Sequence, residues 1–143
     1  MTLEIPGIVE RRQSPRYEID LSAVIVLDKG DTLPVFTRNI SSSGLQIICD
    51  SWVADQIEPR GIQSHIVTHI HFKVIMELPT AGGTEKLHAN CRIMSLQRLS
   101  QDKYMLNLAF MGFENNSEAT LNKFLERYQQ QKPVVIKAFA CPG

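Results

Sequence analysis

Two short groups of polar residues near the start of this 143-residue chain have the chemistry needed to bind an anionic purine nucleotide. The first group is the pair Arg12 and Arg16, with Arg11 beside it. A guanidinium group can fork onto phosphate oxygens or onto guanine O6 and N7, and its flat face can stack on a base. Lysine could neutralise a phosphate but could not fork or stack in this way. The arginines therefore indicate a site for an anion that carries bases.

The second group is Asn39, Ser41 and Gly44. On an extended backbone Asn39 and Ser41 point to the same side, because they are two positions apart. The Asn39 oxygen could accept from guanine N1–H or N2–H2, and the Ser41 hydroxyl can donate or accept. Glycine at position 44 suits a backbone that needs a positive φ or a close approach. The group predicts a strand end that presents polar side chains to a ligand and then turns.

In residue type, spacing and order, Arg12-x-x-x-Arg16 followed by Asn39-x-Ser41-x-x-Gly44 resembles the signature of PilZ domains, bacterial receptors for the second messenger cyclic di-GMP. The wider resemblance covers roughly residues 11–131. It implies a mainly β fold, a small six-stranded antiparallel barrel with a C-terminal α-helix. It also implies that the arginines fold over Asn39 and Ser41 from a flexible N-terminal arm, and that Gly44 permits the close approach.

The resemblance further implies that the protein binds a ligand and catalyses no reaction. The expected protein is a non-enzymatic receptor that binds cyclic di-GMP and signals to a downstream protein partner when the arm closes. No cofactor is expected beside this ligand. Arg11 could stack on a second guanine, which favours an intercalated pair of ligands over one and allows a homodimer linked by ligand.

Other functions stay open from the residues alone. A PilZ-like adaptor would act through protein–protein contacts without any nucleotide. A small barrel that binds single-stranded RNA would need aromatic residues interleaved with basic ones on exposed strands, whereas the few rings here mostly occupy core positions. Each half of the motif also has a plainer explanation, a solvated basic N-terminus or a Ser-rich hairpin turn. Because both halves of the motif occur, and at the separation that is typical of the family, we favour the receptor.

Composition narrows the class of protein. Lys plus Arg and Asp plus Glu both number 15, and this balance argues against a broad basic face for bulk nucleic acid. Three widely spaced cysteines form neither a CxxC motif nor a disulfide framework, which is typical of the cytoplasm. No signal peptide and no membrane-spanning apolar segment are expected.

Hydrophobic periodicity predicts about six strands followed by one helix. Alternating apolar residues indicate strands, and the spacing of Leu121, Phe124, Leu125 and Tyr128 indicates an amphipathic helix that Asn116 or Ser117 could cap. Residues 50–64 are ambiguous, with a helical turn and a loop as the expectation. The expected strands cover residues 17–27, 33–39, 45–49, 66–78, 87–93 and 104–110.

These elements predict three segments. Residues 1–16 form the arm, residues 17–131 form the barrel and helix, and residues 132–143 form an apolar tail. Because exposed apolar tails invite aggregation, the tail is expected to pack on the barrel rather than to dock on a partner.

Metal binding and catalysis have little support in the sequence. His65, His69 and His71 would share one face of the 66–78 strand, and a solvated strand face explains them more simply than a zinc site. The run Ser41 to Ser43 lies in no nucleophile motif, and no glycine-rich phosphate loop is present. The sequence therefore predicts no catalytic residues and no metal ligands.

Overall fold

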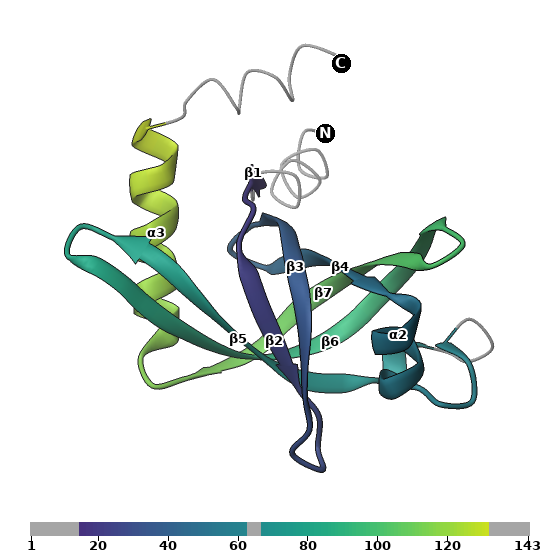
Figure 1. Cartoon of the computed structure of the whole chain (residues 1–143). Coiled ribbons are helices and arrows are strands. Elements are labelled where there is room, and N and C mark those ends of the chain that lie inside the picture. Colours follow the sequence, from purple (N-terminus) through teal and green to yellow (C-terminus); the bar gives the residue numbers. More distant parts are fainter. Residues whose placement is uncertain (1–14, 63–66, 132–143) are drawn as a thin grey trace, which may run out of the picture.

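The computed structural model of the chain describes residues 15–62 and 67–131. Within these residues the chain forms strands joined by short loops, with one helix after β4 and a longer one at the end (Figure 1). The strands are β1 (Tyr17–Glu18), β2 (Ser22–Val26), β3 (Thr32–Ile40), β4 (Gly44–Asp50), β5 (His71–Thr80), β6 (Gly83–Ser100) and β7 (Lys103–Glu114). The helices are α2 (Ser51–Ile57), the 3-10 helix η2 (Val67–His69) and α3 (Ser117–Gln131).

Six of the strands close into an antiparallel barrel. They follow the order β3-β2-β5-β6-β7-β4, and β3 pairs with β4 to complete the ring. The short β1 pairs with the far end of β3, where Tyr17 lies opposite Ile40. Closure removes the exposed strand edges that an open sheet would present. The predicted six-stranded barrel with a C-terminal helix is confirmed.

The barrel core comes from the apolar residues that alternate along each strand. Ile25, Ile47, Val74, Leu87 and Leu106 are all fully buried inside it. Because successive side chains of a strand point to opposite faces, the intervening residues face outward. The same alternation that predicts the strands therefore places their side chains.

The predicted 17–27 strand is broken in the structure. Residues 19–21 separate β1 from β2, and the buried Thr37 holds this break. Its hydroxyl accepts from the Leu21 N–H at 2.9 Å and donates to the Leu21 carbonyl at 2.8 Å. A buried hydroxyl with both functions satisfied stabilises the break, which apolar periodicity alone cannot show.

The start of the predicted 66–78 strand is also wrong. Residues 67–69 form η2, and β5 begins only at His71. The connection between the predicted 66–78 and 87–93 strands is tighter than expected, because Pro79 and Thr84 are already paired within the β5–β6 ladder. Ala81 and Gly82 alone make the turn.

Both helices are anchored to the barrel. The Asp50 carboxylate caps α2 by accepting from the Val53 N–H at 2.9 Å, so the ambiguous 50–64 stretch does contain a helix. Leu121 and Phe124 of α3 are buried, as the amphipathic pattern predicts. The Ser117 hydroxyl accepts from the His88 N–H of β6 at 2.7 Å, which ties the start of α3 to the sheet.

Among the described residues, no helix combines the length and the apolar character that a membrane crossing requires. The predictions for residues 1–14 of the arm and for the 132–143 tail lie outside the residues that the structure describes.

We expect Cys49 and Cys91 to resist alkylation in the folded protein. Burial raises the pKa of each thiol to about 12, and the Asp50 charge adds to this at Cys49. Only the thiolate reacts, so iodoacetamide at about pH 8 should label these two residues only after denaturation. Peptide mapping by mass spectrometry checks this, and fast labelling of either residue without denaturant would contradict the packing of the core.

Candidate functional site

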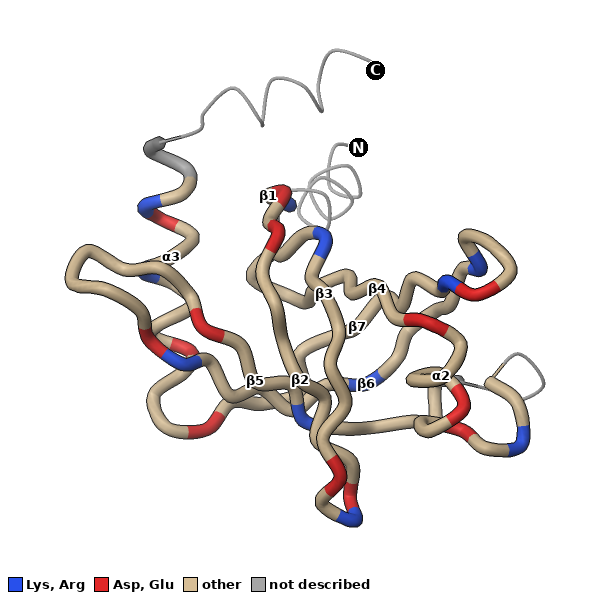
Figure 2. The backbone as a smooth tube through the Cα atoms, in the orientation of Figure 1, with Lys and Arg blue, Asp and Glu red and all other residues tan. Residues whose placement is uncertain are grey.

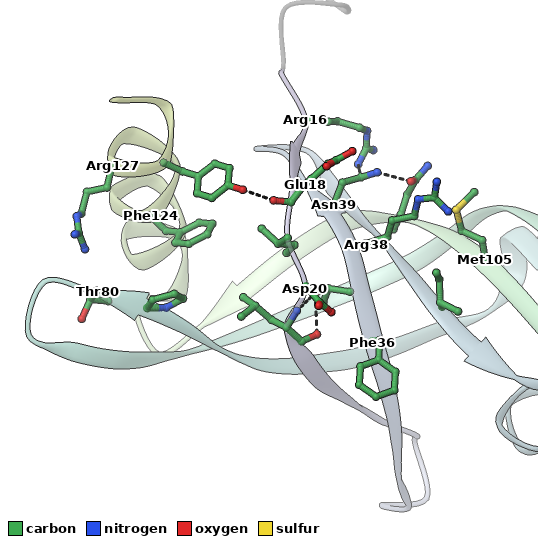
Figure 3. A pocket seen from close by; sticks show the side chains of 17 residues that line it. Arg16, Glu18, Asp20, Phe36, Arg38, Asn39, Thr80, Met105, Phe124 and Arg127 are labelled. Atoms are coloured by element: carbon green, nitrogen blue, oxygen red, sulfur yellow. Dashed lines mark hydrogen bonds between the residues drawn. The ribbon is translucent and has the colours of Figure 1, made fainter. Parts of the chain in front are cut away.

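A groove of about 1190 Å³ runs over the outside of the barrel, between β1, β3 and β4 and the side of α3 that carries Phe124, Arg127 and Tyr128 (Figure 3). This volume exceeds the ~300–1,000 Å³ that is common for small-molecule sites. We call it the outer groove. It is lined by Arg16, Glu18, Asp20, Phe36, Arg38, Asn39, Gln46, Met105, Phe124, Arg127 and Tyr128, among others.

Two of the predicted ligand residues meet at one end of the outer groove. Arg16 precedes β1 and Asn39 lies near the end of β3, and the pairing of these strands brings them together. One guanidinium N–H of Arg16 donates to the Asn39 Oδ1 at 2.7 Å (Figure 3). Partial burial lowers the pKa of the Arg16 guanidinium, which nevertheless stays charged near neutral pH. Arg11 and Arg12 lie outside the described residues.

A β-bulge turns Asn39 toward the groove. In β3 the odd positions Leu33, Val35 and Thr37 face inward, so regular alternation would also point residue 39 into the core. The register shifts between Thr37 and Asn39, with Arg38 as the extra residue. Ile40 is fully buried and Asn39 faces out as a result. The bulge is therefore the local structure that builds this part of the site.

Ser41 and Gly44 form the hairpin turn next to the groove. The Ser41 side chain is 0 % exposed, and its hydroxyl accepts from the Ser43 N–H at 3.2 Å and lies 3.4 Å from the Gly44 carbonyl oxygen. The Ser41 N–H donates to the Gly44 carbonyl at 2.9 Å and closes the turn. The structure thus places Asn39 on the groove and Ser41 beneath the turn that follows it.

The close approach expected at Gly44 is to the protein's own backbone. A Cβ atom at this position would lie 2.0 Å from the Leu108 carbonyl oxygen of β7. Gly44 pairs with Ala109 in the β4–β7 ladder, so a side chain here would collide with the neighbouring strand. The glycine keeps β4 and β7 in contact at the point where the hairpin turns.

Charged residues of both signs line the outer groove. In the chain as a whole the two signs are balanced, and Figure 2 shows them spread along the described backbone. Arg38 and Arg127 line it, and within the described residues neither forms an ion pair. Glu18 and Asp20 line the same groove. The sequence analysis identified neither Arg38 nor Arg127 as a groove residue, although the place of Arg38 beside Asn39 was a signal.

Apolar groups form part of the same surface. Phe36 of β3 is 58 % exposed and lies opposite Ile48 of β4, which lies opposite Met105 of β7. An exposed ring beside cations and amides suits the flat face of a base. The sequence pattern does not predict that Phe36, Ile48 and Met105 are neighbours, because they come from three different strands.

The histidines do not share a strand face. His69 belongs to η2, His71 begins β5, and His65 lies outside the described residues. Among the described residues, no three His, Cys, Asp or Glu side chains lie close enough together to hold a metal ion.

Comparison with known proteins identifies the family. The model of the PilZ domain matches residues 10–127, which is most of the chain. The chain belongs to the PilZ domain family. No curated protein matches its sequence.

Solved structures show the same PilZ fold at low sequence identity. The Bacillus subtilis inhibitor of motility, MotI, is 16% identical with a TM-score of 0.66, over 85% of this chain and 53% of that one. The PilZ domain of YcgR from Escherichia coli, solved with cyclic di-GMP, is 13% identical with a TM-score of 0.58, over 89% and 98%. PlzA from Borreliella burgdorferi, solved in complex with cyclic di-GMP, is 11% identical with a TM-score of 0.54, over 91% and 57%. The chain thus spans about half the length of MotI and PlzA and nearly all of the YcgR domain.

Proposed function

We propose that this PilZ chain is a non-enzymatic receptor for cyclic di-GMP in the bacterial cytoplasm, and that it signals to a protein partner. The observation that carries the proposal is the meeting of Arg16 and Asn39 at the outer groove. These two residues belong to separate halves of the family's motif, and the fold brings them together where a ligand can reach both. The YcgR domain and PlzA, whose structures hold cyclic di-GMP, support this ligand.

The groove offers a partner for each part of the ligand. Asn39 can accept from the guanine N–H groups once Arg16 moves from its oxygen to the ligand. Arg16 and Arg12 then fork onto guanine or phosphate, and Arg38 supplies a further cation beside them. Two phosphodiester charges match this cluster, while Glu18 and Asp20 on the same groove disfavour a longer polyanion.

Closure of the arm over the ligand would carry the signal. Tyr128 of α3 donates its hydroxyl to the Glu18 carbonyl, and its ring packs edge-on against Tyr17 at 5.3 Å between centroids. Arg16 immediately precedes Tyr17, whose ring makes this contact with Tyr128. A ligand that pulls on Arg16 therefore acts on the junction of β1 with α3, and changes the surface offered to a partner.

The direct test is a calorimetric titration of cyclic di-GMP into the wild type and into an Arg12→Ala/Arg16→Ala variant. Binding that is micromolar or tighter in the wild type and lost in the variant is the expected result. We expect two nucleotides per chain, with Arg11 stacking on the second guanine. A stoichiometry of one would refute that role for Arg11, and equal binding by both proteins would refute the proposed site.

One observation favours the adaptor function instead. Asn39 and Ser41 both hydrogen-bond to other groups of the protein, so their polar atoms have protein partners. An adaptor of this kind would give no heat with cyclic di-GMP. Its partner binding would survive the double arginine variant and would depend on α3 or on residues 132–143.

A further inference from the structure

A chain of polar side chains crosses the outer face of the barrel from Arg16 to Ser95. Arg16 donates to Asn39 Oδ1 at 2.7 Å, and the Asn39 amide donates to Gln46 Oε1. The Gln46 amide donates to Asn107 Oδ1, and the Asn107 amide donates to Ser95 Oγ at 2.7 Å. We call Asn39, Gln46 and Asn107 the amide ladder.

Backbone pairing places the members of the amide ladder side by side. Asn39 of β3 lies opposite Gln46 of β4, and Gln46 lies opposite Asn107 of β7. Asn107 in turn lies opposite Ser95 of β6. Directly opposed side chains start only ~4.5–5.5 Å apart at Cβ, so these contacts follow from the register of four strands.

The amide ladder has a direction. Arg16 sets it while it binds Asn39, and Gln46 and Asn107 keep it once Arg16 moves to the ligand. A guanidinium can only donate, so Asn39 must turn its oxygen toward Arg16 and its NH2 group toward Gln46. Turning Asn39 alone would set its oxygen against the Gln46 oxygen and its NH2 group against the guanidinium. Asn39 can therefore reverse only if Gln46 and Asn107 reverse with it.

This direction matters for the base that the groove can read. The Watson–Crick edge of guanine carries two adjacent donors, N1–H and N2–H2, and one amide oxygen can accept from both. Adenine offers one donor beside the bare lone pair of N1, which an amide oxygen repels. An oxygen held toward the groove is thus complementary to guanine and not to adenine.

We infer that Gln46 is a positioning residue that holds the Asn39 oxygen toward the groove and so selects guanine over adenine. The inference rests on the proposed function, because it concerns the same ligand. Gln46 does not need to touch the nucleotide for this role. It acts through Asn39, and Asn107 supports it from the next strand.

Two variants separate the hydrogen bonds of the Gln46 side chain from its size. Gln46→Met keeps the length of the side chain but removes its acceptor and its donor, so the Asn39 amide can turn once Arg16 moves to the ligand. Gln46→Glu keeps an acceptor for the Asn39 NH2 group and thus keeps its oxygen toward the groove. Gln46 lies on the outer face of β4 between the buried Leu45 and Ile47, so both variants leave the core intact.

The measurement is the ratio of the dissociation constants for cyclic di-AMP and cyclic di-GMP, obtained by calorimetry. We expect the ratio to fall by about tenfold in Gln46→Met, the worth of roughly one hydrogen bond, and to stay near the wild-type value in Gln46→Glu. The added charge of Gln46→Glu weakens both dianions alike and cancels in the ratio. Equal ratios in all three proteins would overturn the inference but leave the proposed function standing.

A second measurement needs no ligand. In nitrogen-15 spectra of the free protein, the NH2 protons of Asn39 should exchange slowly with solvent in the wild type and in Gln46→Glu, and quickly in Gln46→Met, where their acceptor is gone. Fast exchange in the wild type would show that the amide ladder does not hold Asn39, and the inference would fail. A wild type that binds neither nucleotide would refute the proposed function, and this inference with it.

Discussion

Replacing Arg16 with alanine is expected to weaken cyclic di-GMP binding by roughly 10- to 150-fold, because a charge-assisted hydrogen bond is worth about 1.5–3 kcal/mol. Arg16 is the one arginine of the motif that the structure describes, and it is already held at the groove by Asn39. Calorimetry on the single variant measures the loss. The free energy of unfolding should change little, since the guanidinium is only half-buried.

Two further variants make this result specific. Arg60→Ala removes the same charge at a site where the arginine pairs with Glu58, outside the groove, and should bind like the wild type. Arg16→Lys keeps the charge but loses the planar fork, so its affinity should lie between those of wild type and Arg16→Ala. Equal losses in Arg16→Ala and Arg60→Ala would mean that net charge, rather than the site, controls binding.

The barrel and its helix could be predicted from the sequence because their signals are local. Alternation of apolar residues marks most of each strand, and the change to helical spacing at Leu121 and Phe124 marks α3. The errors are the break at residues 19–21 of the predicted 17–27 strand and the start of the predicted 66–78 strand. Ile66 and Ile70 have the phase of the apolar residues of β5, but residues 67–69 between them form a 3-10 helix, since periodicity does not record where pairing with the next strand begins.

The orientation of Asn39 could not be predicted in the same way. Asn39 has an odd number like the buried Leu33 and Val35, so in a regular strand its side chain would point into the core. The bulge at Arg38 reverses the phase, and a bulge depends on how two strands pair rather than on either strand alone. The resemblance predicts Asn39 as a ligand residue, and the bulge explains why its side chain faces the groove.

The chain of hydrogen bonds that continues from Asn39 was missed for a related reason. Gln46, Asn107 and Ser95 come from three other strands, and only the register brings them into line. Ser41 was expected on the same face as Asn39, but β3 ends at Ile40 and the serine enters the turn. Two members of one motif thus have different surroundings, one on the groove and one under the hairpin.

Replacing Gly44 with alanine is expected to destabilise the fold by about 2–3 kcal/mol, because an added methyl group would overlap the backbone of β7. The nearest atom is the Leu108 carbonyl oxygen, which cannot swing away as the end of a flexible side chain could. β4 must therefore move from β7, and this weakens the ladder that holds Gln46 opposite Asn107. Denaturant unfolding followed by circular dichroism measures the change.

Gly112→Ala is the matched control, since it adds the same methyl group in β7 where nothing lies within 4 Å. Its free energy of unfolding should stay within about 1 kcal/mol of the wild type, on the stabilising side, because alanine restricts the unfolded chain. If Gly44→Ala were as stable as this control, the close approach of β4 to β7 would be wrong. If it were stable but bound no cyclic di-GMP, Gly44 would serve the ligand rather than the barrel.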